Sequence, residues 1–211
     1  MFADSRPVSG GRDVAPAPAS GGHPGATSIG VRLVADVLRV GGVGSLVWAA
    51  AGGEWVNAAL FALVLGGLML PRMVPTRPGI DLTYGATLLF AAWSAVEDLY
   101  VRYDWLDNAV HTVACGLVAA VVHRLLVTAS VLPPATDRSL RRAGMGVVVT
   151  VWALGLALGT LWEAGEWFGH THLDQRIQVG YSDTVGDLMA DCLGALVAGL
   201  VVARSTMVRP R

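Results

Sequence analysis

The stretch AGMGVVVTVWALGLALGTLW, residues 143–162, decides the fold class of this chain because it carries no charged side chain over its whole length. A helix of about 20 mostly apolar residues is long enough to cross the hydrocarbon core of a bilayer. A helix on the surface of a soluble domain would have one polar face, which this stretch lacks. The stretch therefore indicates a membrane-spanning helix.

The composition of the whole chain agrees with a membrane protein. The 211 residues are 54% hydrophobic and 15% charged, and the formal net charge is −1. An ordinary soluble domain carries roughly 25% charged residues. A chain this apolar is not expected to be disordered or collagen-like. It also lacks the surplus of basic residues that is typical of a nucleic-acid-binding protein. We expect the lipid bilayer as its main partner and no nucleic acid.

Similar apolar segments follow one another on both sides of this stretch, with short polar breaks between them. Together they predict an all-α polytopic membrane protein, a bundle of six transmembrane helices within a domain at residues 31–204. The Pro-, Gly- and Ser-rich residues 1–30 are predicted to be a disordered tail, and residues 205–211 a second short tail. The six predicted spans are 31–52, 55–71, 81–101, 105–128, 143–167 and 184–203.

The arginines predict how these helices are oriented. All fifteen basic residues are arginines, and six spans place thirteen of them on the side of the two termini, with only Arg102 and Arg176 on the other side. Basic loops are retained in the cytoplasm, so both termini are predicted to be cytoplasmic. The preference for arginine, together with abundant Ala, Gly and Val, indicates a GC-rich bacterial source. The predicted location is therefore the bacterial plasma (inner) membrane.

Acidic residues gather on the opposite, outer half, where eleven of the sixteen are found. Many of them stand at helical spacing near the outer ends of the predicted spans, so those of one helix share one face. Such polar stripes cannot face lipid and must face one another or a water-filled cavity. The three stripes are Asp104, Asp107 and His111; Glu163, Glu166 and His170; and Asp183, Asp187 and Asp191.

This combination of side chains predicts a divalent metal ion as cofactor. Neighbouring carboxylates at low dielectric cannot all stay ionised on their own. Either several of them hold protons or a bound cation neutralises them. Carboxylate and imidazole groups on facing helices are also the ligands of di-metal helix bundles. The spacing matches no established signature such as His-Glu-x-x-His. The predicted metal ligands are Asp107, His111, Glu163, Glu166, Asp187 and Asp191.

Several polar residues have a plain structural interpretation that stands beside the functional one. Asp104 and Asp183 are placed where an N-cap would satisfy free backbone N–H groups at a helix start. The six predicted ligands could form a hydrogen-bonded network that only fixes helix packing. Solvated interface or loop positions are the simpler interpretation for Glu54, Glu97, Asp98, Asp174, His170 and His172.

Other features favour structural roles. Gly155 with Gly159, and Gly194 with Gly199, predict close helix packing in the last two spans. Asp36 and Arg39 are three residues apart and are predicted to pair with each other. Aromatic residues near the outer interface predict an interfacial belt that could also hold a lipid headgroup: Trp55, Tyr100, Tyr103, Trp105, Trp162, Trp167 and Tyr181.

Three segments together resemble the YjdF-type inner-membrane proteins, a bacterial six-helix family of unknown function. They are YDWLDNAVH (103–111), WEAGEWFGH (162–170) and GYSDTVGDLMADCLGA (180–195). The resemblance extends over about residues 81–203 and is best at Asp183-Thr184-x-x-Asp187, although the aromatic and Gly-Asp residues usual just before that motif are missing. The chain is more loosely similar to VanZ-like proteins. The resemblance implies the fold and the polar site, and implies no reaction.

Three functions remain open at this level. The first is a metal-dependent enzyme acting on a lipid or lipid-linked substrate at the outer leaflet. The second is an ion-coupled transporter, and the third is a non-catalytic membrane protein whose polar core fixes helix packing or binds a partner. A carrier is disfavoured because the first three spans do not echo the last three, and because the polar stripes stop in the outer half. No nucleophile motif or phosphate-binding signature names the chemistry of an enzyme.

Overall fold

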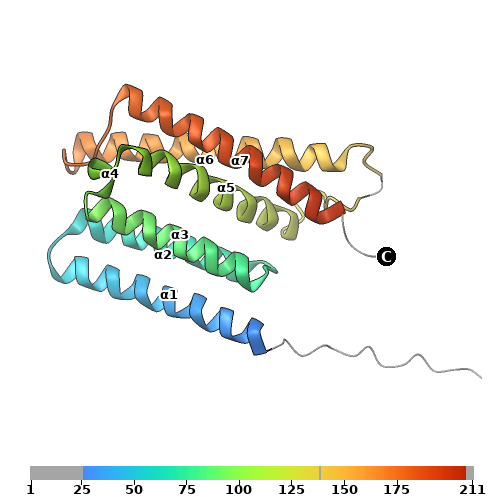
Figure 1. Cartoon of the computed structure of the whole chain (residues 1–211), viewed down its shortest axis with the longest axis horizontal. Coiled ribbons are helices and arrows are strands. Elements are labelled where there is room, and N and C mark those ends of the chain that lie inside the picture. The colour runs from blue at the N-terminus through green and yellow to red at the C-terminus, as the bar shows by residue number, and fades with distance from the viewer. Residues whose placement is uncertain (1–25, 138, 208–211) are drawn as a thin grey trace, which may run out of the picture.

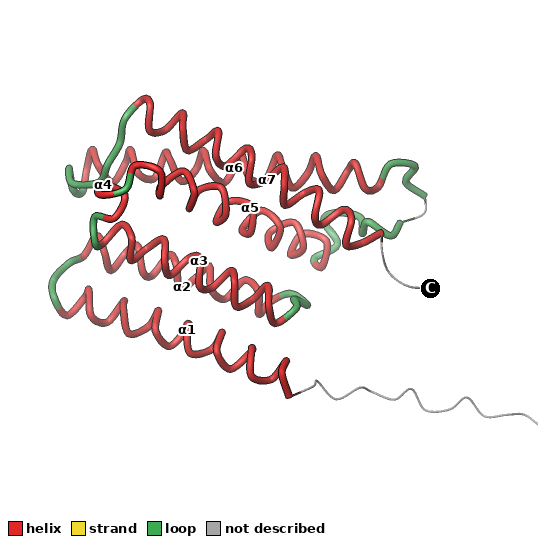
Figure 2. The backbone as a smooth tube through the Cα atoms, viewed as in Figure 1, coloured by secondary structure: helices red, strands yellow, loops and turns green. Residues whose placement is uncertain are grey.

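The computed structural model describes residues 26–137 and 139–207, and this part of the chain is helical with short connections. Six long helices lie side by side and alternate in direction, and one single-turn helix joins the third to the next (Figures 1 and 2). The helices are α1 Ala26–Ala51, α2 Trp55–Met73, α3 Pro78–Val96, α4 Leu99–Arg102, α5 Asp104–Thr128, α6 Ala143–His172 and α7 Tyr181–Met207.

Five of these helices, namely α1, α2, α5, α6 and α7, are long and apolar enough to cross a membrane. The chain is therefore an all-α polytopic membrane protein, as predicted. Helix α3 is as long as α2, at 19 residues, but is not among the five, and its sequence includes Asp81, Thr83 and Tyr84. Length and composition thus support five of the six predicted spans.

The predicted third span, 81–101, is not one continuous helix. Helix α3 ends at Val96, and Asp98 adopts a left-handed backbone conformation with φ of 53°. A left-handed residue cannot continue a right-handed helix, so the chain breaks there before α4 adds a single turn. Glu97 and Asp98 are exposed at this break.

The boundaries of the two predicted tails also differ from the structure. Helix α1 begins at Ala26, so residues 26–30 are helical instead of part of the tail predicted at 1–30. Helix α7 continues to Met207, past the predicted boundary at 204. Residues 1–25 and 208–211 lie outside the described part of the chain.

Helices α1, α2 and α3 pack against one another and form the first half of the bundle. Phe61, Leu68 and Leu89 are central to their apolar core. Large apolar side chains on the other face of α1, such as Val37 and Val40, are exposed. Exposed apolar residues on a long helix are what a lipid-facing surface requires, because the backbone is satisfied within the helix.

A polar network ties the same three helices together at one level. The buried Arg39 guanidinium donates to the Leu68 carbonyl oxygen at 3.0 Å, lies 3.3 Å from Asp36 and pairs closely with the buried Asp81. Arg72 pairs closely with Asp36 and lies 3.7 Å from Asp81. The predicted Asp36–Arg39 pair is therefore present, but it is one edge of a neutral four-residue network.

Helices α5, α6 and α7 form the second half, and glycines let them approach closely. A Cβ atom added to Gly194 on α7 would overlap the Thr112 carbonyl oxygen of α5. One added to Gly155 on α6 would overlap the Ala195 Cβ of α7. Close approach through small residues is the usual way to pack membrane helices, so the predicted role of these glycines is confirmed.

The two halves meet where α2 and α3 contact α5, and α4 links them along the chain. The bundle has two distinct ends in Figure 1. One, here called the α4 end, carries α4 and the α1–α2 and α6–α7 connections. The other, here called the terminal end, carries the start of α1, the end of α7 and the α5–α6 connection. Both ends of the described chain therefore lie at the same end of the bundle.

Candidate cation site

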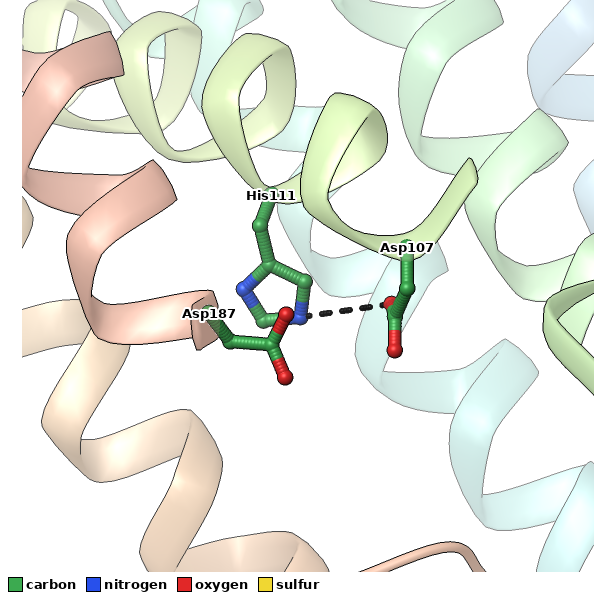
Figure 3. A group of neighbouring side chains, drawn as sticks. All are labelled: Asp107, His111 and Asp187. Atoms are coloured by element: carbon green, nitrogen blue, oxygen red, sulfur yellow. Dashed lines mark ion pairs between the residues drawn. The ribbon is translucent and has the colours of Figure 1, made fainter. Parts of the chain in front are cut away.

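At the α4 end, α5 and α7 bring together a group of acidic and histidine side chains (Figure 3). Asp107 and His111 are four residues apart on α5, and Asp187 and Asp191 are four apart on α7, so each pair shares a helix face. One ligand atom each from Asp107, His111 and Asp187 lies within 4.8 Å of the other two. Atoms at these separations could all contact one bound ion.

His111 has a carboxylate near each ring nitrogen. Its Nε2 atom lies 3.7 Å from Oδ1 of Asp107, and its Nδ1 atom lies 3.2 Å from Oδ1 of Asp191. When Nδ1 donates its proton to Asp191, Nε2 is left with a free lone pair on the side of Asp107. Histidines that bind metals are commonly held in this way, with the other ring N–H donated to a carboxylate.

Three carboxylates of this group are buried, and two of their oxygens lack partners. Asp187, Asp191 and Glu163 are respectively 2%, 1% and 8% exposed. Within the described chain, neither Oδ2 of Asp191 nor Oε1 of Glu163 has a hydrogen-bond partner. A buried carboxylate oxygen without a partner is costly, and a bound water or cation at these atoms would remove that cost.

Gly159 makes the room that Asp191 occupies. A Cβ atom at this position of α6 would overlap the Asp191 carboxylate, and Oδ2 is the atom it would meet first. Gly159 was predicted as a packing residue, and its missing side chain brings α6 against the polar group as well. The site therefore involves three helices, with α5 and α7 supplying most side chains and α6 supplying the notch.

Glu163 stands four residues after Gly159 on α6 and Glu166 seven residues after it, so both share the helix face that meets Asp191. Neither residue belongs to the tightest group of three. The structure thus places Asp107, His111, Asp187 and Asp191 together and sets Glu163 and Glu166 beside them.

Negative charge outweighs positive charge at this end. Arg176 pairs with Asp174 at 2.7 Å and lies 3.8 Å from Glu54. Arg102 is exposed on α4. Among the described residues, neither arginine forms an ion pair with the buried carboxylates. The buried carboxylates therefore have no arginine partner in the described part of the chain.

The remaining members of the predicted stripes lie outside the group. Asp104 is exposed, and the N-cap of α5 is Tyr103, so the prediction that Asp104 caps this helix is wrong. Asp183 lies inside the first turn of α7, which begins at Tyr181, so it is not a cap either. His170 lies in the last turn of α6 and not in an exposed loop, so its interpretation as a loop residue is wrong; its Nδ1 lies 2.6 Å from the Ile177 carbonyl oxygen.

Tyr100 has a role that the sequence did not indicate. It was predicted as part of the interfacial belt, but its hydroxyl donates to the Ala91 carbonyl oxygen at 2.9 Å and the side chain is half-buried. Burial raises the pKa of Tyr100, and the negative charge of Asp107 raises it further. Other belt residues, including Trp55, Trp105 and Tyr181, are exposed at the α4 end.

These features define a class of protein: a polytopic all-α membrane protein with a buried Asp/His group between its helices. The chain belongs to the family described as "Predicted membrane protein (DUF2238)", whose family model matches residues 32–207. This membership is consistent with the resemblance to the YjdF-type membrane proteins of unknown function. No curated protein and no solved structure matches the chain.

Proposed function

We propose that this protein spans the bacterial inner membrane six times, with both termini in the cytoplasm, and binds a divalent cation at its outward α4 end. The number of spans is supported by α3, which runs between the same two ends of the bundle as α2 (Figure 1). The orientation is supported by the thirteen arginines that fall on the side of the termini.

The observation that carries the cation site is the setting of His111. Its Nδ1 is held by Asp191, and its Nε2 is turned toward Asp107. Asp187 contributes a further oxygen within 4.8 Å. In this proposal Asp107, His111 and Asp187 are the ligands, and Asp191 orients the histidine. The carboxylates of Asp107 and Asp187 already balance the charge of a divalent ion, and Glu163 and Glu166 lie outside this ligand set.

The ligand chemistry narrows the identity of the ion. A set of one imidazole and two carboxylates suits Zn²⁺ or Mn²⁺ better than Ca²⁺, which prefers oxygen ligands alone. A divalent cation in such a site polarises a phosphoryl or carbonyl oxygen and acidifies a bound water. An enzyme acting on a lipid or lipid-linked substrate at the outer leaflet is therefore the catalytic form of this proposal.

The apolar packing between the acidic group and the terminal end favours a site that opens to one side of the membrane. It disfavours an ion-coupled carrier. Ala119, Val151 and Ala195 are fully buried together between α5, α6 and α7. A carrier needs a polar or hydrated route to the other side of the membrane, whereas an enzyme needs only access from one side. This apolar layer separates the acidic group from the terminal end.

Metal analysis of the purified full-length protein tests the cation site. After incubation with Zn²⁺ or Mn²⁺ and removal of free metal, we expect about one ion per chain in the wild type. Asp187→Asn should lose the ion, whereas Glu97→Gln should keep it, because Glu97 is exposed at the same end but lies outside the group. Equal metal content in the two variants, or none in the wild type, would refute the proposal.

The enzyme form has a separate readout. Metal-loaded wild type in phospholipid vesicles should release a phosphate or a free headgroup, and Asp187→Asn should not. Stoichiometric binding without any such release would reduce the proposal to a cation-binding membrane protein.

A further inference from the structure

A pocket with basic side chains in its wall lies at the terminal end of the bundle, between α5, α6 and the connection that joins them. It has a volume of about 260 Å³. Its polar members include His123, Arg141 and Arg142, and much of the remaining wall is apolar, with Leu132, Pro133 and Val147 among the lining residues. We call it the α5–α6 pocket. It is far along the bundle from the candidate cation site.

The two arginines of this pocket have no acidic partner in the described part of the chain. Arg39, Arg72 and Arg176 all form ion pairs, but no such pair involves Arg141 or Arg142. The carboxylate of the nearby Asp137 instead accepts a hydrogen bond from the Ser139 backbone N–H at 2.9 Å. The pocket therefore carries positive charge that the protein itself does not neutralise.

The start of α6 adds to this positive character. Arg142 is the N-cap residue and makes no capping hydrogen bond through its side chain. The helical hydrogen bonds of α6 begin at Gly146, whose backbone N–H donates to the Arg142 carbonyl oxygen at 3.0 Å. The preceding N–H groups of a helix have no partner within it, and together with the helix dipole they attract anions. Helix α6 is 30 residues long.

His123 provides an independent observation that points to a ligand. The side chain is 6% exposed and lines the pocket from α5. Among the hydrogen bonds of the described residues none involves its ring, although an imidazole always carries at least one N–H donor. Buried polar groups are normally hydrogen-bonded. The ring of His123 lines the pocket without a partner among the described residues, so its N–H is free to donate to an acceptor from outside the chain.

We propose that the α5–α6 pocket binds the phosphate group of an anionic phospholipid from the leaflet at the terminal end. Phosphate is an acceptor, and the arginines, the helix start and His123 all present donors. Basic pockets between membrane helices on the cytoplasmic side are known binding sites for anionic headgroups. A free phosphate ion shares this chemistry, but Leu132, Pro133 and Val147 offer apolar contact that only a lipid would use.

This site is independent of the proposed cation site, since the two lie at opposite ends of the bundle and share no residue. It relies on the proposed orientation only for the leaflet that supplies the lipid. Loss of metal binding would therefore leave it untouched, and loss of lipid binding would leave the cation site untouched.

Lipid titration of the full-length protein, followed by native mass spectrometry in detergent, tests the proposal. We expect phosphatidylglycerol to bind more tightly than phosphatidylcholine. The double variant Arg141→Gln/Arg142→Gln should weaken phosphatidylglycerol binding by about 10- to 30-fold, because each arginine near the headgroups contributes about 1 kcal/mol. The matched control is Arg32→Gln/Arg77→Gln, which removes two exposed arginines from the same end.

The control decides between a built site and general attraction to anionic lipid. Retained binding in the control with loss in the pocket variant supports the proposal, and equal weakening in both overturns it. His123→Leu, which keeps the apolar volume, should also weaken binding. An inorganic phosphate arm distinguishes the source: binding of phosphate that depends on Arg141 and Arg142, without phosphatidylglycerol binding, would overturn the lipid assignment.

Discussion

The Nδ1 atom of His111 lies 3.2 Å from Oδ1 of Asp191, although eighty residues separate the two along the chain. This contact joins α5 to α7 and orients the ring so that Nε2 faces Asp107. Asp191 is thus a positioning residue for His111, and its other oxygen occupies the notch at Gly159. The geometry of the candidate cation site depends on this pair.

Replacing Asp191 should weaken cation binding without abolishing it. Asp191→Asn removes the charge that holds the Nδ1 proton, and loss of such an orienting carboxylate lowers metal affinity by about 10- to 100-fold. Competition with a chelator of known affinity measures the change. Glu97→Gln is the control and should match the wild type. Unchanged affinity in Asp191→Asn would show that the histidine is not oriented by this contact.

Gly159→Ala should destabilise the protein, because its methyl group would overlap the Asp191 carboxylate. Overpacking of this kind typically costs about 1–3 kcal/mol. The matched control is Gly165→Ala on the same helix, where an added Cβ would meet nothing within 4 Å. The control should be neutral or stabilising by up to about 1 kcal/mol. Unfolding in mixed detergent measures the free energy of unfolding of both variants. Equal changes would contradict a tight contact between Gly159 and the Asp191 carboxylate.

Asp81→Asn should be strongly destabilising, because it leaves the buried Arg39 guanidinium without its closest anionic partner. Breaking a buried ion pair from one side costs about 3–5 kcal/mol. Asp36→Asn in the same network should cost about 1 kcal/mol or less, since the Asp36 side chain is 51% exposed. The free energies of unfolding of the two variants test this order, and the reverse order would refute it.

Cysteine labelling should establish the number of spans. In a Cys115→Ala/Cys192→Ala background, Gln175→Cys should react with an impermeant thiol reagent in intact cells. Thr136→Cys should react only after the cells are permeabilised. Both positions are exposed, at the α4 end and the terminal end respectively. If α3 did not cross the membrane, the chain after it would be inverted, and the labelling pattern of the two positions would reverse.

The α6–α7 connection should respond to pH through Asp174. Its carboxylate accepts hydrogen bonds from the guanidinium and the backbone N–H of Arg176, and these hold the pKa of Asp174 below its ordinary value. Because the folded pKa is depressed, the contact stabilises the loop above the unfolded pKa and is lost as the pH falls through the folded pKa. Arg176→Gln should raise the pKa toward the ordinary value, with the backbone contribution retained. Carboxyl NMR titration measures this shift, and an unchanged pKa would contradict it.

The fold class could be predicted from the sequence because each long helix is apolar over most of its length. The positions of Asp107, His111, Asp187 and Asp191 on their helix faces also follow from local spacing. Which faces meet was indicated by the glycines, since Gly194 and Gly155 mark where α7 approaches its neighbours. The predicted role of the acidic and histidine side chains as metal ligands stays a prediction.

Other features depend on contacts that no local pattern encodes. Arg39 and Asp81 are 42 residues apart, and each has a nearer candidate partner in the sequence. The break at Asp98 occurs at a non-glycine residue, so the usual signal for a left-handed position is missing. His123 lies within an apolar span, and only the folded chain places it beside Arg141 and Arg142.

The division of the bundle into two halves also sets the order in which the molecule is built. Each described partner of the Arg39 side chain belongs to residues 35–81, so every member of the neutral four-residue network has been synthesised before the ribosome reaches α5. Asp187 and Asp191 lie on α7, which follows all the other described helices along the chain. The acidic group at the α4 end is therefore incomplete until α7 has been inserted, and a nascent chain without α7 lacks two carboxylates of the proposed cation site.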